Sequence, residues 1–400
     1  MTIAFPFAPT QPFASQSFLT RVVMRAGASL DVRQELAQLG RARPLVLSTP
    51  GMATRAGYAN IIQSLDGIAY RQCNQIPEHT DESVALQIVA QAREHQADAI
   101  VAIGGGSTSD TAKGVAMLLA EGGAFADHAS RFEPPRTVHT PRLNQPKIPI
   151  ITIPFTASGA EVTGSFGIRG ADGYKMLFSD PQVASRVVLL DPALNVSVPA
   201  SIMLSTAMNG LAHCVEGLYS SARSPISSAL ALHTLPLFAR AMRAIRAEPV
   251  EQAHRADLLT AGVMSGMVLA SARSCLHHAI CHVIGAKYGV SHGNANSAIL
   301  PHAVRFNLPA AVGPLSLMGQ SLGLTGTSEE DRALAAVQWI EQLQRDLGVP
   351  RSLKALGVPH DHLESIAAHV MHERGLAFNP RTVHDAAELL GILRAAWDPD

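Results

Sequence analysis

The stretch IVAIGGGSTSDTAKG, residues 100–114, decides how the first half of the chain folds. Its apolar start predicts a buried strand within 97–107, and the glycines that follow allow a tight turn close to a ligand. The continuation TAKGVAMLLA (111–120) has the apolar spacing of a helix. Backbone amides at the start of such a helix bind phosphate oxygens, and the helix dipole adds to the attraction. The stretch therefore favours a dinucleotide pyrophosphate site over a plain tight turn, with the site formed by Gly104, Gly105, Gly106 and Ser107.

The segments around this stretch continue the alternation of strand and helix. RPLVLSTP (43–50), KIPIITIP (147–154) and SRVVLLDP (185–192) are short apolar runs that end in turn residues, and each predicts a buried strand. DESVALQIVAQAREH (81–95) follows Thr80, a candidate helix cap, and has apolar residues at helical spacing. Strands that alternate with helices predict a parallel sheet covered on both faces. The first half is thus expected to be an α/β, Rossmann-like domain that binds a dinucleotide.

The second half has a different pattern. After Pro199 the strand signals stop, and long segments such as DRALAAVQWIEQLQRDL (331–347) carry apolar stripes at helical spacing. We therefore expect two domains, an α/β domain over 1–198 and an all-helical metal and substrate domain over 199–400. The Gly- and Pro-rich segment 121–146 predicts either a surface excursion near the mouth of the active site or a plain variable loop.

Composition narrows the possible classes of function. The 400 residues are 47% hydrophobic and 16% charged, with a net charge of −1, which fits a globular protein and gives little support to nucleic-acid binding. No apolar run is long enough to cross a membrane, and the start MTIAFPFAPTQPF lacks the pattern of a signal peptide. No metal-type pair spacing joins the four cysteines, which are expected to be reduced thiols in a cytoplasmic protein: Cys73, Cys214, Cys275 and Cys281.

Histidines gather in SCLHHAICHVIGAKYGVSHGNAN (274–296). His278 and His282 lie four apart on one helical face, and His292 follows a turn. Upstream, MNGLAHCVEGLYS (208–220) places Asn209 and His213 on one helical face. This spacing favours a catalytic or metal cluster over isolated structural histidines.

A metal reading of this cluster has a weakness in its charge. Three histidine ligands with a bound water are a known catalytic zinc arrangement. Asn209 would then be a weak neutral ligand or a hydrogen-bonding neighbour. Because a carboxamide supplies no negative charge to offset a dication, metal occupancy is expected to be low. The nitrogen ligands permitted by the spacing are His213, His278 and His292.

Taken together, these motifs resemble those of the iron-containing (group III) alcohol dehydrogenase superfamily. GGGSTSDTAK is similar to its cofactor loop GGGSxxDxAK, and IPFTASGAEVT (153–163) to its segment near the nicotinamide. HHAICHVIGAKYGVSHGNANSAILPHAVRFN (277–307) and NPRTV (379–383) are similar to its histidine signature and a C-terminal motif. The resemblance spans nearly the whole chain. It implies a dehydroquinate-synthase-like architecture, an NADH or NADPH cofactor, a small-molecule substrate and a homodimer or larger assembly.

The same resemblance assigns roles to single residues. The four metal-ligand positions of the family hold Asn209, His213, His278 and His292, so the first ligand, an Asp in the family, is substituted. His282 matches a position close to the reacting carbon. The cofactor pocket is implied to include Asp110, Thr156, Ser158 and Lys175.

Thr49, at the end of a predicted strand, stands where NAD-selective enzymes often have an acid that binds the ribose hydroxyls. No carboxylate at that point repels a 2′-phosphate, so both NADH and NADPH are expected to be accepted. The alternative is that another residue sets the selectivity.

Within the superfamily the chain looks closest to the maleylacetate reductase branch. STPG (48–51), AMNGLAHCVEGLYS (207–220) and LHHAICHVIG (276–285) resemble that branch, which generally works without a metal and reduces a carbon–carbon double bond conjugated to a ketone. Asp110 and HGNAN (292–296) are instead typical of the alcohol dehydrogenase branch. The leading interpretation is an NAD(P)H-dependent, maleylacetate-reductase-like enzyme. Alternatives are an alcohol dehydrogenase or aldehyde reductase that depends on Fe²⁺ or Zn²⁺, a non-catalytic binding relative, and a lyase of the dehydroquinate-synthase type.

The mechanism expected for the leading interpretation is hydride transfer between the two domains. Without a metal, protonated histidines with a pKa near the working pH would donate hydrogen bonds and then a proton. The candidates are His213, His278, His282 and His292. A carboxylated substrate would also need cationic contacts, for which the candidates are Arg169, Arg273, Lys287 and Arg305.

Overall fold

A six-stranded parallel sheet forms the first half of the chain in the computed structural model, which describes residues 13 and 18–399. Across the sheet the strands run in the order β1 (Arg21–Met24), β10 (Val187–Leu190), β7 (Ile150–Pro154), β4 (Ala99–Gly104), β2 (Pro44–Ser48) and β3 (Arg71–Cys73). All neighbouring pairs are parallel. The four predicted strands are confirmed as β2, β4, β7 and β10, whereas β1 and β3 were not predicted. The signal-peptide expectation concerns the first 13 residues, of which all but Phe13 lie outside the described residues.

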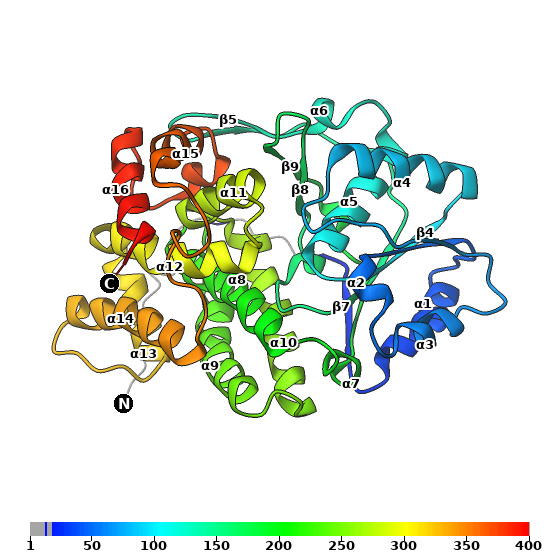
Figure 1. Cartoon of the computed structure of the whole chain (residues 1–400), viewed down its shortest axis with the longest axis horizontal. Helices are drawn as coiled ribbons and strands as arrows, with labels where there is room; N and C mark the ends of the chain where they lie inside the picture. The colour runs from blue at the N-terminus through cyan, green and yellow to red at the C-terminus, as the bar shows by residue number, and fades with distance from the viewer. Residues whose placement is uncertain (1–12, 14–17, 400) are drawn as a thin grey trace.

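Alternation along the buried strands explains why helices cover both faces of this sheet (Figure 1). Leu45 and Leu47 pack into the same hydrophobic cluster as α4 (Glu82–His95) and α5 (Gly106–Glu121). Val46, between them, points to the other face and joins the cluster of α1 (Val32–Gln38) and α3 (Tyr58–Gln63). Successive strand residues point to opposite faces, so a continuous apolar run is needed where both faces are buried.

Two local expectations change at the helices. The helix after the glycines begins at Gly106, five residues before the predicted start, so that the glycine turn itself enters the helix. The N-cap position of α4 is Asp81, whose side chain makes no capping hydrogen bond, so the prediction of Thr80 as the cap is wrong. The Oγ1 of Thr80 instead lies 2.6 Å from the Oγ1 of Thr111 on α5.

The excursion at 121–146 is an ordered crossing between the halves. It contains α6 (Phe125–His128) and a hairpin of β5 (Arg131–Glu133) and β6 (Thr137–His139), and Figure 1 shows β5 reaching across toward α15. Arg136 at the tip donates hydrogen bonds to the carbonyl oxygens of Ala377 (3.2 Å) and Asn379 (3.3 Å) and to Oγ1 of Thr382 (3.0 Å). A second, unpredicted hairpin pairs β8 (Ser165–Arg169) with β9 (Lys175–Ser179).

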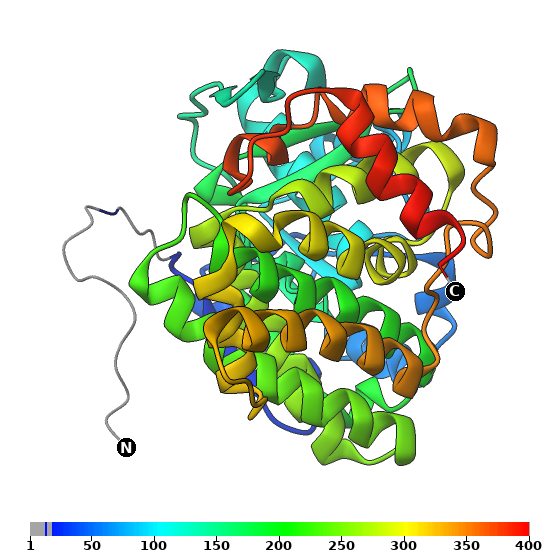
Figure 2. The same cartoon turned by 90° about the vertical axis from the view of Figure 1, so that its left-hand side faces the viewer.

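The second half is helical, as predicted (Figure 2). After β10 and the short α7 (Pro192–Asn195), the described chain forms α8 (Ala200–Tyr219), α9 (Pro225–Ala247), α10 (Gln252–Ala272), α11 (Leu276–Tyr288), α12 (His292–Asn307), α13 (Val312–Ser321), α14 (Glu329–Leu347), α15 (Leu363–Val370) and α16 (Ala386–Trp397). The fold class is therefore confirmed, while the domain limits at 198/199 stay a prediction. Among the described helices none has by itself the length and hydrophobicity of a membrane span; α10 and α11 together do, with a bend of 110° between them.

The two halves meet closely behind the carboxyl edge of the sheet. Gly159, in the loop after β7, has a φ of 68°, which favours glycine. A Cβ there would lie 2.3 Å from the carbonyl oxygen of Gly262 and 2.7 Å from the nitrogen of Gly266, both on α10. The loop therefore contacts the α10 backbone directly, which brings the sheet edge within reach of α8.

Candidate active site

One cavity of about 970 Å³ lies between the two halves. Segments that follow β2, β4 and β7 line one side of it, and α8, α11 and α12 line the other, as expected for a ligand site at the carboxyl edge of a parallel sheet. Of the residues predicted for the cofactor, the metal and catalysis, the cavity brings together all except Gly104: Thr49, Gly105, Gly106, Ser107, Asp110, Thr156, Ser158, Lys175, Asn209, His213, His278, His282 and His292.

The glycine loop is shaped for an anion. No side chain caps the start of α5, so its first amide groups are left for a ligand. A Cβ on Gly105 would come 2.9 Å from Cγ2 of Thr156, which shows that only glycine fits between the neighbouring loops. The buried hydroxyl groups of Thr108 and Ser109 also have no hydrogen-bond partner among the described residues. These features fit a dinucleotide pyrophosphate.

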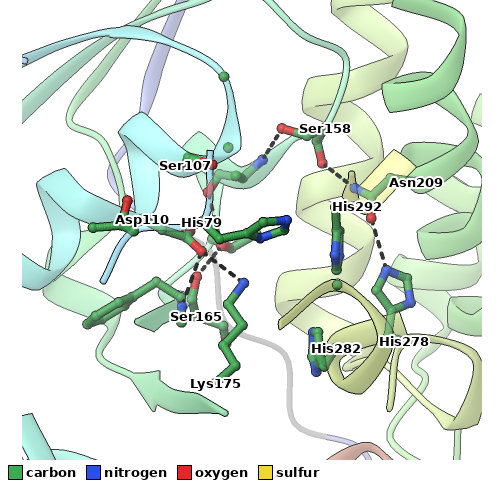
Figure 3. Close-up of a pocket in the computed structure, with 18 of the residues that line it drawn as sticks. His79, Ser107, Asp110, Ser158, Ser165, Lys175, Asn209, His278, His282 and His292 are labelled. Carbon is green, nitrogen blue, oxygen red and sulfur yellow. Dashed lines mark hydrogen bonds and ion pairs between the residues drawn. The ribbon is translucent and has the colours of Figure 1, made fainter. Parts of the chain in front are cut away.

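Asp110 and Lys113 face different ways although both lie on α5. Asp110 Oδ2 accepts a hydrogen bond from the backbone nitrogen of Gly167 (3.2 Å) and lies 3.5 Å from Nζ of Lys175 at the cavity (Figure 3). Lys113 is buried and donates to the carbonyl oxygens of Ala160 (2.6 Å) and Ser165 (3.0 Å). Burial lowers the pKa of Lys113 to about 8. Lys113 therefore holds the 160–165 loop, and Lys175 is the lysine that faces the cofactor side.

Two residues near the cofactor side modify the sequence interpretation. The Oγ1 of Thr49 accepts a hydrogen bond from the nitrogen of Met52 (3.2 Å) and caps the short helix α2 (Pro50–Ala53). His79 was not predicted, yet it lines the cavity, and its buried Nε2 has no partner among the described residues (Figure 3). It follows β3, the polar edge strand that the sequence did not reveal, so no local signal identified it.

Asn209 is hydrogen-bonded within the histidine cluster (Figure 3). Its Nδ2 lies 3.3 Å from the carbonyl oxygen of Ser158, which can only accept, so Nδ2 must donate. Its Oδ1 therefore faces Nε2 of His278 at 3.2 Å, and that nitrogen must carry a hydrogen. The two residues are thus matched as acceptor and donor without an ion between them.

Glu216 completes this group from the next turns of α8. Its Oε2 lies 2.5 Å from Nδ1 of His278 and accepts from the nitrogen of Cys275 (3.0 Å), while Oε1 accepts from the nitrogen of His277 (2.9 Å). Glu216 is fully buried, and it binds the backbone amides at the start of the neighbouring helix α11. The sequence analysis missed it, although the 209, 213 and 216 spacing places all three on one helical face.

Burial keeps most of the clustered imidazoles neutral. It also raises the pKa of Glu216, so a protonated Glu216 donates to Nδ1 of a neutral His278 whose hydrogen is on Nε2. Burial lowers the pKa of His278 to about 3, and the pKa values of His213 and His292 fall well below 6.5 for the same reason. The rings of His213 and His278 stack with their centroids 4.8 Å apart, so a charge on one disfavours a charge on the other. The expectation of protonated rings near the working pH is therefore wrong for these three residues.

The donor set does not fit a tightly bound metal ion. Within residues 18–399, the trio of His, Cys, Asp or Glu side chains whose ligand atoms lie within 4.8 Å of one another is Glu216, His277 and His278, not the predicted histidine triad. Glu216 is already satisfied by backbone amides, and Nε2 of His278 is taken by Asn209. The facing ligand is a neutral carboxamide, so the site lacks the anionic oxygen that would offset a dication.

His282 differs from its neighbours. Its Nδ1 lies 3.1 Å from Oε2 of Glu373, its ring stacks on that of His292 at 5.7 Å, and it lines the cavity. Glu373 precedes the 3₁₀ helix η6 (Arg374–Phe378) and was not predicted, because 91 residues separate it from His282.

Two arginines lie near this end of the cavity. Arg273 and Arg374 both line it, and neither forms an ion pair with an acid in the described part of the chain. Burial, together with the charge of Arg273, lowers the pKa of Arg374 to about 10. Arg169 also lines the cavity but is held by Asp81, whereas two further candidates are not among the lining residues: Lys287 and Arg305.

Comparison with known proteins agrees with this geometry. Residues 20–192 match the iron-containing alcohol dehydrogenase family, and residues 203–397 match the C-terminal region of the Fe-containing alcohol dehydrogenase family. Maleylacetate reductase from Sphingobium indicum is 32% identical over 350 residues, which cover 87% of this chain and 88% of that protein.

Solved structures show the same architecture. Maleylacetate reductase from Agrobacterium tumefaciens superposes with a TM-score of 0.79 at 28% identity, covering 97% of this chain and 98% of that one. A 1,3-propanediol oxidoreductase gives 0.88 at 25% identity, with 97% and 100% covered. The family implies an NAD(P) cofactor and an iron-type metal, with less support for zinc. The chain is therefore an NAD(P)-dependent oxidoreductase of the iron-containing alcohol dehydrogenase superfamily, on its maleylacetate reductase branch.

Proposed function

We propose that this enzyme reduces the conjugated double bond of a small carboxylated enone, in the manner that the name of its maleylacetate reductase relatives implies. The observation that carries the proposal is that one cavity holds both an uncapped phosphate loop and a histidine cluster whose first predicted ligand position is Asn209. The reduced nicotinamide would supply a hydride to the carbon of the double bond that lies farther from the ketone. The negative charge that then develops on the ketone oxygen needs hydrogen bonds and finally a proton.

The cofactor would be held by residues of the α/β half. The amides of Gly105, Gly106 and Ser107 would bind the pyrophosphate, with Lys175 adding a positive charge at the same side. Thr49 presents no carboxylate to a 2′-phosphate. We therefore propose that both NADH and NADPH are accepted.

His282 is the proposed proton donor. Among the four predicted histidines, it is His282 whose Nδ1 contacts a carboxylate while its Nε2 has no protein partner among the described residues. A neighbouring carboxylate offsets the positive charge of a doubly protonated imidazole. His213, His278 and His292 would act as neutral rings that shape the cavity and donate hydrogen bonds, because burial lowers the pKa of each.

The arginine pair supports a carboxylated substrate. Two guanidinium groups that face one cavity without an acidic partner are stabilised when an anion binds between or beside them. Arg273 also has a φ of 65° and a ψ of 164°, a conformation that is nearly confined to glycine and costs other residues on the order of 1–3 kcal/mol. Retaining this conformation at the cavity is consistent with a role in binding a substrate carboxylate.

The alternative is a metal-dependent alcohol dehydrogenase or aldehyde reductase, which the iron-containing relatives favour. The two functions differ in metal demand and in product. NAD(P)H consumption should be followed with maleylacetate and with simple aldehydes, using the native protein and the same protein after chelator treatment, with metal content measured in parallel.

We expect chelator-treated enzyme to consume one NAD(P)H per maleylacetate and to yield the product saturated at the former double bond. Turnover of aldehydes only, restored by Fe²⁺, would support the alternative. Assembly as a homodimer and a cytoplasmic location stay predictions.

A further inference from the structure

The contact between His282 and Glu373 joins two distant parts of the helical half. Oε2 of Glu373 lies 3.1 Å from Nδ1 of His282, and each side chain is only 14% exposed. Glu373 is the sequence neighbour of Arg374, which lines the cavity, yet its ion pair is with the histidine on α11. The pair is therefore a specific, largely dry contact and not a solvated surface pair.

Chemistry fixes which nitrogen carries the hydrogen. A carboxylate is only an acceptor, so Nδ1 of His282 must donate to Glu373. The rotation of the ring is then set by two contacts, this hydrogen bond and the stack on His292, whose interplanar angle is 16°. His282 lines the cavity, and its Nε2 has no hydrogen-bond partner among the described residues.

His278 offers the comparison within the same cluster. Its Nδ1 faces an acid, the fully buried Glu216, and Asn209 occupies its Nε2. A carboxylate on one nitrogen and a free second nitrogen therefore occur together at His282. This is the arrangement in which a carboxylate orients an imidazole for proton transfer.

We propose that Glu373 is a positioning residue that, through Nδ1 of His282, directs Nε2 of His282 at the reacting oxygen of the substrate. This inference rests on the proposed function for the identity of the substrate, but the orienting contact itself does not. Glu373 touches neither substrate nor cofactor in this role. Its removal should thus lower turnover without weakening cofactor binding.

The kinetic test compares E373Q, E373A and E373D with wild type, and uses E364Q as the control because Glu364 is 77% exposed and lies outside the cavity. We expect kcat to fall about tenfold to a hundredfold in E373A, as is typical when the partner of a functional histidine is lost. The KM for NAD(P)H should stay within about twofold of wild type, since the phosphate loop is untouched. E373D should recover part of the loss.

A double-mutant cycle separates positioning from a general loss of structure. If Glu373 acts through His282, E373A should have little further effect on kcat in an H282A background. An equal loss of kcat in both backgrounds would overturn the proposal. So would an E373A variant with wild-type kcat.

A second readout needs no turnover. In ¹⁵N-histidine NMR spectra, H282N identifies the His282 signals, and wild type should show Nδ1 of His282 carrying a hydrogen that is bonded to a carboxylate. E373A should lose that signature, while E364Q should keep it. Unchanged His282 signals in E373A would refute the positioning role even if every substrate tested were inert, whereas inert substrates with the expected signals would refute only the proposed function.

Discussion

Oδ1 of Asn209 lies 3.2 Å from Nε2 of His278, and the carbonyl oxygen of Ser158 sets this orientation by accepting from Nδ2 of the same amide. The contact is one neutral hydrogen bond at the position where the sequence resemblance implies a metal ligand. Because the amide oxygen of Asn209 only accepts, the neutral His278 ring must carry its hydrogen on Nε2.

The first prediction concerns metal affinity. N209D should bind Fe²⁺ or Zn²⁺ at least about tenfold more tightly than wild type, because a carboxylate supplies a charged oxygen beside the histidines. Equilibrium dialysis against each ion measures the two dissociation constants. N60D, at an exposed position, adds the same charge elsewhere and should leave the affinity unchanged. Equal affinities in wild type and N209D would contradict the argument.

The second prediction concerns the phosphate loop. G105A should raise the KM for NADH about tenfold or more, because the new methyl group would lie 2.9 Å from Cγ2 of Thr156 and push the loops apart. Steady-state kinetics and a thermal-shift titration with NADH give the measurement. G313A is the matched control, since a Cβ at Gly313 on α13 meets nothing within 4 Å. Unaltered cofactor binding in G105A would show that the pyrophosphate lies elsewhere.

The third prediction concerns the substrate carboxylate. R273Q should raise the KM for maleylacetate about tenfold, in line with the roughly 1.5–3 kcal/mol of a hydrogen bond to a charged group. The KM for NAD(P)H should not change. The control is R305Q, because Arg305 is exposed and pairs with Glu341 away from the cavity. A larger effect on the KM for NAD(P)H than on that for maleylacetate would place Arg273 at the cofactor instead.

The fourth prediction concerns stability against pH. Burial raises the pKa of Glu161 to about 7, above its ordinary value of 4.5, so between these two values the folded chain binds more protons than the unfolded one. The free energy of unfolding should therefore fall as pH rises through this window, by on the order of 3 kcal/mol for this group.

Urea denaturation at intervals from pH 4.5 to 7.5 tests this prediction. E161Q has no ionisable group at this position, so its free energy of unfolding should lack the Glu161 contribution. The stability of E161Q relative to wild type should therefore rise with pH. E94Q, at an exposed carboxylate, should follow the wild-type curve. Parallel curves for wild type and E161Q would mean that Glu161 titrates normally.

The elements that could be predicted from the sequence are those with a clear local pattern of apolar residues. β2, β4, β7 and β10 are continuous apolar runs because both of their faces are buried, and this pattern is visible in the residues. The strand β3 reads RQC and lies at the sheet edge, where one side has no strand neighbour and polar residues are tolerated. Such a strand carries no distinctive pattern.

In the candidate site, too, residues within a local motif could be predicted and a contact between distant segments could not. Asn209, His278 and His282 stand in motifs with helical spacing, so the sequence could group them. Glu373 lies 91 residues from its histidine, and a contact of that kind depends on how α11 packs against the C-terminal segment. The pKa values also followed from burial in the folded core, which residue spacing does not show.

The β5–β6 hairpin gives the molecule a second bridge between its halves, beside the covalent passage from α7 to α8. Arg136, at the tip of the hairpin, donates hydrogen bonds to Ala377, Asn379 and Thr382, a few residues beyond Glu373. Arg374, the neighbour of Glu373, also donates hydrogen bonds to Ser130 and Phe178 on the same side. Any opening of the cleft on that side would have to break the hydrogen bonds of both guanidinium groups, and it would also disturb the segment that we propose orients His282.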